Sequence, residues 1–237
     1  DVLGARRKDI VLATKFGMAM SDDGTKQGAS RRYIMTAVED SLRRLRTDYI
    51  DLYQTHWPDH HMRYGDTLAA LGKLIDQGKV RAIGASNETS WGLMKSLWAA
   101  ERHNTARYDS VQNNFSWINR RCESELAQVC RREQISLFPY SPLGGGVLTG
   151  KYNDKLPEGA RFTDYLRNGG ARQKSMAQRF VNDRSLEATR RFARIAEDIG
   201  VSLVALAVAW SRQHDFVAST IIGATSVAQL DQSLEAV

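Results

Sequence analysis

The sequence has few cysteines and no long run of apolar residues. Its two cysteines, Cys122 and Cys130, stand eight residues apart in a helical pattern, about 12 Å along a helix axis, which is too far for a disulfide. No Cys-x-x-Cys pair occurs, so a redox or metal motif built on cysteine is not indicated, and we expect a reducing, cytoplasmic compartment. The longest mostly apolar stretch, residues 201–210, is far shorter than a membrane span, so no membrane association is expected.

The composition is that of a globular protein with a small excess of positive charge. Of 237 residues, 42% are hydrophobic and 25% are charged, which excludes a disordered or fibrous chain. The net charge of +6 is spread over arginine pairs in or beside helical patterns, so solvated helix faces explain most of it. Steering of an anionic cofactor or substrate is the alternative, and no nucleic-acid partner is expected.

Short apolar runs alternate with longer amphipathic patterns along the chain. Strands are expected at residues 9–14, 49–55, 80–85, 110–114, 135–140 and 216–222. Helices are expected at 30–46, 66–77, 89–100, 123–133, 185–199 and 202–213, and another begins at Val227. Between residues 144 and 183 the sequence predicts a long polar segment rich in glycine. Six strand-helix units of this kind predict a parallel sheet covered by helices, an α/β fold.

Polar or small residues stand where the expected strands end. These are Lys15, His56, Asn87, Gln112, Tyr140 and Gly223. In a (β/α)8 barrel the carboxyl ends of all strands ring one mouth, where such enzymes keep their chemistry. A doubly wound sheet would gather its ligand at one point, and no G-x-G-x-x-G follows the first strand. The pattern favours a (β/α)8 TIM barrel with about six of its eight units in this chain.

Lys15 and His56 are the residues best suited to catalysis. An ammonium group at the end of an apolar strand either polarises a neighbouring acid or forms a Schiff base, unless it simply extends into solvent. An imidazole at a barrel mouth suits proton transfer or the orientation of a carbonyl oxygen. A metal site with His60 is the alternative, but Pro58 prevents the helix that would bring the two rings together.

Amide and aromatic side chains follow at the next strand ends. Asn87 and Gln112 offer paired donors and acceptors that suit a planar carboxamide, whereas a turn at Ser86 and Asn87 and a satisfied buried amide are the plainer interpretations. Tyr140 offers a flat face for stacking.

Two further segments could bind an anion. The glycine run at residues 144–146 exposes backbone N–H groups, although such runs are usually ordinary loops. Residues 223–226 lead into the last helix, and a helix N-terminus is a ready anion site, although an ordinary N-cap explains these residues equally well.

Taken together, these segments resemble the aldo-keto reductase family. The matching pieces are TKFG at 14–17, DLYQTHWP at 51–58, GKVRAIGASN at 78–87, QNNF at 112–115, YSPL at 140–143, LTGKY at 148–152 and IGAT at 222–225. They occur in the family's order and cover nearly the whole chain. Within the family the sequence resembles the branch of bacterial Tas-like reductases and, more distantly, potassium-channel β-subunits.

The resemblance implies a (β/α)8 barrel that binds NADPH without a Rossmann domain. It gives Lys15 and His56 as two of four catalytic residues and Trp57 as a substrate contact. It gives the nicotinamide contacts as Ser86, Asn87, Gln112 and Tyr140, and the pyrophosphate contacts as Ser141, Leu143, Gly145, Lys151 and Arg161. It gives the adenosine contacts as Gly223, Thr225, Gln229, Gln232 and Ser233.

One departure from the family is large. The family's catalytic Asp and Tyr precede the helix that residues 1–4 resemble, so neither has a counterpart among the 237 residues. We therefore expect one barrel domain over residues 1–237, truncated at its N-terminus and at its C-terminus.

The resemblance implies an NADPH-dependent oxidoreductase that reduces a small-molecule aldehyde or ketone to an alcohol. A nucleotide-sensing regulatory subunit of the same fold, with little or no turnover, is the alternative. An aldolase that forms a Schiff base on Lys15 is a third possibility, against which the pairing of Asn87 with Gln112 argues.

Overall fold

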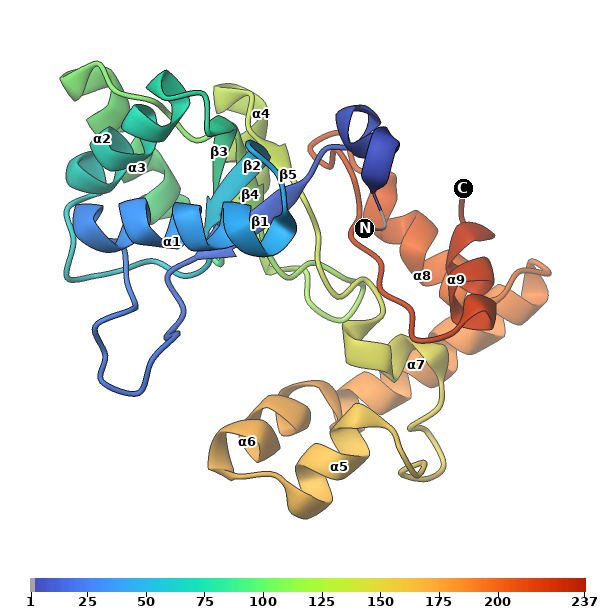
Figure 1. The fold of residues 1–237 in the computed structure, drawn as a ribbon. Coiled ribbons are helices and arrows are strands. Elements are labelled where there is room, and N and C mark those ends of the chain that lie inside the picture. The colour runs from blue at the N-terminus through green and yellow to red at the C-terminus, as the bar shows by residue number, and fades with distance from the viewer. Residues whose placement is uncertain (1–2) are drawn as a thin grey trace. The chain divides into compact units, whose positions relative to one another are not determined.

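The computed structural model describes residues 3–237, and their fold divides into two compact units. Unit 1 comprises the chain up to Asn113 together with Glu125–Leu137, and unit 2 comprises Asn114–Ser124 and Phe138–Val237. Figure 1 shows the strands and helices α1 to α4 of unit 1, and helices α5 to α9 of unit 2, in the order of the chain.

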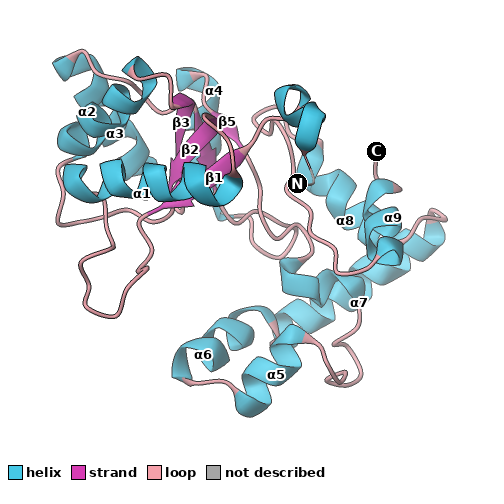
Figure 2. Ribbon diagram, in the orientation of Figure 1, coloured by secondary structure: helices cyan, strands magenta, loops and turns pink. Residues whose placement is uncertain are grey.

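Unit 1 is a parallel sheet with helices, an α/β fold. Its five strands are hydrogen-bonded in the order β1-β2-β3-β4-β5 and are drawn in magenta in Figure 2. The strands are β1 (Ala13–Phe16), β2 (Ile50–Thr55), β3 (Val80–Ser86), β4 (Ser110–Gln112) and β5 (Ser136–Leu137). The helices are a 3-10 helix η1 (Gly4–Asp9), then α1 (Arg31–Leu45), α2 (Tyr64–Asp76), α3 (Ser90–His103) and α4 (Leu126–Glu133).

Local sequence explains why these elements form. The Ser30 hydroxyl caps α1 by accepting the N–H of Tyr33, and the Thr89 hydroxyl caps α3 in the same way at Gly92. The apolar stripe of α1 is buried, and all six residues of β2 are buried, as expected for a parallel strand covered on both faces. These predicted elements are confirmed to within a few residues.

The amino ends of the strands in unit 1 are tied together by charge. The Asp51 carboxylate, at the start of β2, accepts hydrogen bonds from Arg7 (2.8 Å), Arg81 (2.9 Å) and the N–H of Leu12 (2.9 Å). The two guanidinium groups lie on the Tyr49 ring, 3.9 and 4.0 Å from its centroid. Burial raises the pKa of Asp51, but the Leu12 N–H and the two arginines outweigh it and hold the pKa below its usual value.

Unit 2 is helical. Two short 3-10 helices, η2 (Arg121–Glu123) and η3 (Gly144–Thr149), precede α5 (Arg161–Asn168), α6 (Ala171–Phe180), α7 (Asp183–Asp198), α8 (Leu203–Arg212) and α9 (Val227–Leu234). One buried cluster contains Val147, Tyr152, Phe162 and Ala177, and so joins η3 to α5 and α6. Over the described residues, no helix combines the length and the apolar character that a membrane span requires.

The structure corrects three expectations. The strand expected at residues 9–14 is instead β1 at Ala13–Phe16, and Val11 is 77% exposed. Residues 216–222 form no strand in the described part of the chain: Val217 is a single bridge residue, and the Ile221 N–H donates to the carbonyl of Pro139 (2.8 Å). Phe216 is buried against Phe115. The segment 144–183, for which the sequence predicts no helix or strand, contains η3, α5 and α6. The α/β class is confirmed, whereas the sheet of the described residues has five strands and does not close. That residues 1–237 form a single domain stays a prediction.

We predict that Asp51→Asn lowers the free energy of unfolding by about 2–4 kcal/mol at neutral pH, since it leaves two guanidiniums without their buried partner. A depressed carboxyl pKa stabilises the fold above the unfolded pKa of about 3.9 and loses that effect as pH falls through the folded value. The difference between variant and parent should therefore narrow below about pH 4. Urea unfolding at several pH values measures it.

The matched control is Asp76→Asn, which removes an exposed partner of Lys73 (3.3 Å) and should cost less than about 0.5 kcal/mol. Equal losses for the two variants would contradict a structural role for the Asp51 cluster.

Candidate active site

The register of the sheet brings Lys15 and His56 to one place. Lys15 of β1 pairs with Gln54 of β2, so the two side chains leave the sheet on the same face. His56 follows two residues after Gln54, and its backbone N–H donates to the carbonyl of Phe16 (2.9 Å). Asn87, just after β3, donates from Nδ2 to the carbonyl of His56 (2.9 Å). The carboxyl ends of three neighbouring strands are thus joined, with an amine and an imidazole between them.

The two groups influence each other electrostatically. Burial lowers the pKa of Lys15. Burial, and after it the positive charge of Lys15, lowers the pKa of His56, so the imidazole is neutral at pH 7. Within the residues that the structure describes, no carboxylate forms an ion pair with Lys15. The site therefore holds a half-buried cation beside a neutral imidazole that can donate an N–H to an oxygen atom.

The predicted carboxamide contacts lie together beside this pair. The Ser86 hydroxyl donates to the carbonyl of Gln112 (2.8 Å), which also accepts the backbone N–H of Asn87 (3.0 Å). Asn87 has a left-handed backbone, with φ of 57°, a conformation that Asn tolerates better than most residues. Its Nδ2 also donates to the Ser86 hydroxyl (3.2 Å). These bonds hold the Ser86 and Asn87 side chains and the Gln112 backbone at adjacent strand ends, and Ser86 and Gln112 are buried.

Sequence reasoning missed Gln54. Its side chain is fully buried on the face that carries Lys15, and its amide nitrogen and oxygen have no hydrogen-bond partner in the described part of the chain. A polar amide in such a place is costly unless something binds it. The two-residue period of β2, which aligns Gln54 with His56, is the signal that would have found it.

Of the side chains that follow His56, Trp57 is a candidate substrate contact, whereas His60 and His61 face solvent. Trp57 is 50% exposed directly after the imidazole, where a substrate could reach it. His60 and His61 are exposed, and among the residues the structure describes no cluster of three or more His, Cys, Asp or Glu could hold a metal.

In unit 2, Tyr140 lies a few residues before the glycine run, which begins the 3-10 helix η3. Tyr140 pairs with Asn114 in an isolated parallel bridge and is half-buried, and burial raises the pKa of its hydroxyl. Ser141 follows with a left-handed φ of 56°, and Leu143 precedes η3.

The glycine run passes beneath two cationic side chains. A Cβ built on Gly145 would lie 2.4 Å from the ring of Phe162 and 3.1 Å from the guanidinium of Arg161. A Cβ on Gly146 would lie 3.1 Å from Nζ of Lys151. The bare backbone is therefore what allows both cations to approach it. The N–H groups of Gly144 and Gly146 donate to the carbonyls of Ser141 and Leu143, so the two cations are the groups that would hold a phosphate beside this bare backbone.

The predicted adenosine contacts gather only in part. The Gln229 side chain accepts from the N–H (2.9 Å) and the hydroxyl (3.0 Å) of Thr225 at the start of α9. Ser233 is buried and donates to the carbonyl of Gln229 (2.9 Å), one turn further along. Gly223 and Gln232 are exposed. Thr225 and Gln229 thus form one cluster, whereas the Ser233 hydroxyl is used within the helix.

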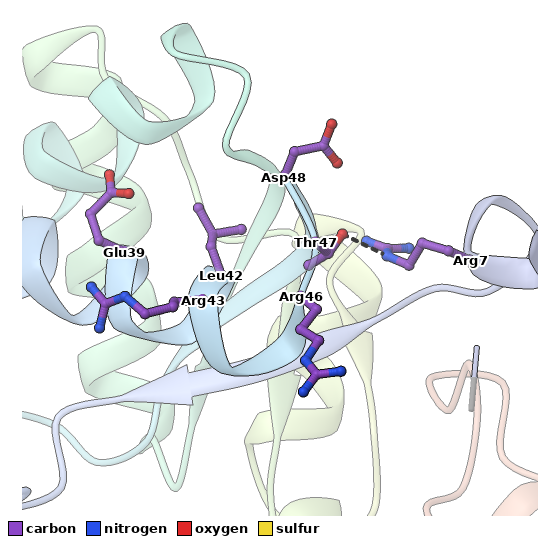
Figure 3. Close-up of a pocket in the computed structure, with 7 residues that line it drawn as sticks. All are labelled: Arg7, Glu39, Leu42, Arg43, Arg46, Thr47 and Asp48. Atoms are coloured by element: carbon purple, nitrogen blue, oxygen red, sulfur yellow. Dashed lines mark hydrogen bonds between the residues drawn. The ribbon is translucent and has the colours of Figure 1, made fainter. Parts of the chain in front are cut away.

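A hollow of about 620 Å³ lies at the other end of the strands in unit 1 (Figure 3). It is shallow and carries both signs of charge. Arg7 is already bonded to Thr47 (3.0 Å), and Figure 3 shows that the guanidiniums of Arg43 and Arg46 do not converge. This hollow is therefore not a candidate active site.

Comparison with known proteins points to one family. A model of the Aldo/keto reductase family matches residues 2–237. "Protein tas" of Escherichia coli is 37% identical over 98% of this chain and 70% of its own length. A "Probable voltage-gated potassium channel subunit beta" of Arabidopsis thaliana is 33% identical over 99% of this chain and 70% of its own. "Aldo-keto reductase AMT2" of Alternaria alternata is 34% identical over 88% of this chain and 54% of its own.

We predict that Lys15→Met raises the pKa of His56 without restoring its usual value of about 6.5, because burial is the larger cause of the depression and stays in place. An NMR titration of the histidine ring protons measures the change. Lys26→Met, which removes an exposed cation from a loop, should leave the His56 titration unaltered. An unchanged pKa in the Lys15 variant would mean that the two side chains do not lie together.

Proposed function

The chain belongs to the aldo/keto reductase family, and from this premise we propose that it is an NADPH-dependent oxidoreductase that reduces aldehydes or ketones to alcohols. The observation that carries the proposal is the pair formed by Lys15 and His56 at the carboxyl ends of neighbouring strands. Family membership supports oxidoreductase activity in general, and the particular residues below are our assignment.

The proposed chemistry divides between the two residues. A bound nicotinamide nucleotide supplies the hydride that carbonyl reduction requires. Neutral His56 donates its ring N–H to the carbonyl oxygen of the substrate and so orients that group. Lys15 holds a positive charge beside this oxygen, on which negative charge develops during reduction. The same charge lowers the pKa of the Tyr that the resemblance implies as proton donor. Trp57 contacts the body of the substrate.

The remaining predicted residues would hold the nucleotide. Ser86, Asn87 and Gln112 offer hydrogen bonds to a carboxamide, and Tyr140 offers a ring face. The cradle of Gly145, Lys151 and Arg161 suits a pyrophosphate, with Ser141 and Leu143 beside it. Thr225, Gln229, Gly223, Gln232 and Ser233 are assigned to the adenosine end. The choice of NADPH over NADH rests on Arg161 and Thr225 and on the resemblance to the family.

We predict that Lys15→Met lowers kcat for aldehyde reduction by roughly 100-fold or more, because it removes the charge beside the developing oxyanion. Nucleotide binding, which uses other residues, should stay nearly intact. Steady-state consumption of NADPH and quenching of tryptophan fluorescence by NADPH measure the two effects. The resemblance implies a Tyr as the proton donor, and both measurements use the whole protein.

Lys26→Met is the matched control, since it removes one lysine charge from an exposed loop. Normal turnover in the Lys15 variant would refute the assignment, and loss of NADPH binding there would place Lys15 in the nucleotide site instead.

A regulatory role is the second candidate, and the relative named as a potassium channel subunit beta favours it. In that role the same residues would bind the nucleotide, and its bound state would matter more than turnover. Incubation with NADPH and a panel of aldehydes separates the two. The enzyme consumes NADPH in proportion to the aldehyde supplied, whereas the regulatory subunit binds NADPH tightly and leaves it unconsumed.

A further inference from the structure

A cavity in unit 2 is lined by none of the residues assigned to the proposed reaction or to the nucleotide. Its volume is about 520 Å³, within the range of small-molecule sites. Three stretches line it: residues 117–121, the end of α6, and the start of α7. All three stretches belong to unit 2, so the whole lining of the cavity comes from one compact part of the chain.

The charged residues that line this cavity all have one sign. Arg120, Arg121, Arg179 and Arg184 line it, and no Asp or Glu does. Arg120 pairs with Glu123 (2.7 Å). Over the described residues, no ion pair occupies the other three guanidiniums. Guanidinium groups bind carboxylates and phosphates through two parallel hydrogen bonds, so an anion is the ligand that this lining suits.

The walls of the cavity are aromatic and fixed. Trp117 stacks on Phe192, with 3.8 Å between ring centroids and 5° between planes, and lies 6.0 Å from Trp210. Phe180 stacks on Phe162 at 5.4 Å. Rings that are already held by neighbours lose little freedom when a ligand binds. A flat apolar group can therefore pack against them at low entropic cost.

The neutral polar groups of the lining are used within the protein. The Asn182 side chain caps α7 by accepting the N–H of Ser185 (3.1 Å), and its Nδ2 donates to the carbonyls of Gln178 and Arg179 (3.2 Å each). The Ser185 hydroxyl donates to the carbonyl of Phe180. These bonds fix the junction of α6 and α7, and they leave the arginines as the groups that face a ligand.

One arginine of the cavity acts electrostatically on the proposed nicotinamide contact Tyr140. Burial raises the pKa of Tyr140, and the positive charge of Arg179 opposes that rise, so the two residues lie within electrostatic reach.

We propose that this cavity binds an organic anion, a carboxylate or phosphate carried on a flat apolar body, at a site separate from the nucleotide contacts. The anion lies on the guanidiniums of Arg121, Arg179 and Arg184, and the flat body packs against Trp117 and Phe180. Such an anion has two sources: a carbonyl substrate that bears an acidic group, or a separate effector. The first source rests on the proposed function, and the site itself does not.

The test uses 2-naphthoate, which is flat, anionic and free of a reducible carbonyl, and its neutral counterpart 2-naphthamide. Titration calorimetry on the full-length protein, with and without saturating NADPH, should show naphthoate binding at least about tenfold more tightly than the amide. Equal binding of the two compounds, or no binding of either, overturns the proposal. Loss of naphthoate binding in the presence of NADPH overturns it as well, because the anion would then occupy the nucleotide contacts.

The matched variants locate the site. Arg179→Gln combined with Arg184→Gln should weaken naphthoate binding at least about tenfold and abolish its advantage over the amide. Arg172→Gln combined with Arg194→Gln removes one arginine from each of the same two helices, outside the cavity, and should leave binding unchanged. An equal effect of the two double variants would contradict the assignment. If a variant folds poorly, the comparison of 2-naphthoate with 2-naphthamide on the unaltered protein still tests whether the protein binds the anion.

The two sources are separated by turnover. A carbonyl substrate predicts that 4-carboxybenzaldehyde is reduced with higher kcat/KM than methyl 4-formylbenzoate, and that Arg179→Gln combined with Arg184→Gln removes this preference. An effector predicts equal reduction of both aldehydes. Naphthoate binding without reduction of either aldehyde would refute the proposed function and leave the anion site standing.

Discussion

The parallel register of β1 against β2 is the constraint on which the candidate active site depends. It aligns Lys15 with Gln54, and the two-residue period of β2 then brings His56 to the same face. A shift by one residue would turn Lys15 to the opposite face and separate the charge from the imidazole. Burial is the larger cause of the depressed pKa of His56, and the smaller cause, the charge of Lys15, is a consequence of strand pairing. The proposed chemistry uses both side chains, and the register places them on the same face of the sheet.

The amino and carboxyl ends of the strands in unit 1 differ in how their polar groups are partnered. At the amino ends, the single Asp51 carboxylate binds both Arg7 and Arg81, so each charged group of the cluster has an ion-pair partner. At the carboxyl ends, Lys15 is a cation without an ion-pair partner among the described residues, and Gln54 is a buried amide without a hydrogen-bond partner there. Matched charges stabilise, whereas unmatched polar groups cost free energy unless a ligand or another segment satisfies them. The groups that stabilise the fold and the groups to which we assign the reaction thus lie at opposite ends of the same strands.

Much of this arrangement could be predicted from local sequence. Caps such as Ser30 and Thr89 act within one helical turn, so the helices of unit 1 were predicted well. Lys15 and His56 were also found from local sequence, because each directly follows an apolar run that predicts a strand. The missing strand at 216–222 was predicted wrongly because burial of Phe216 in an aromatic cluster looks the same in sequence as burial in a sheet. Helices α5 and α6, and the arginine cavity, depend on contacts between segments far apart in the chain, which no local pattern records.

The aromatic stack beside the arginine cavity also determines what intrinsic fluorescence reports. In unit 1, Trp57, Trp91 and Trp98 are 50%, 69% and 46% exposed, so each is already largely in water before unfolding. In unit 2, Trp117 and Trp210 lie within a stack of rings and change their surroundings when that stack opens. A blue-to-red shift in emission during denaturation is therefore a signal of the helical unit, and the sheet has to be followed by circular dichroism.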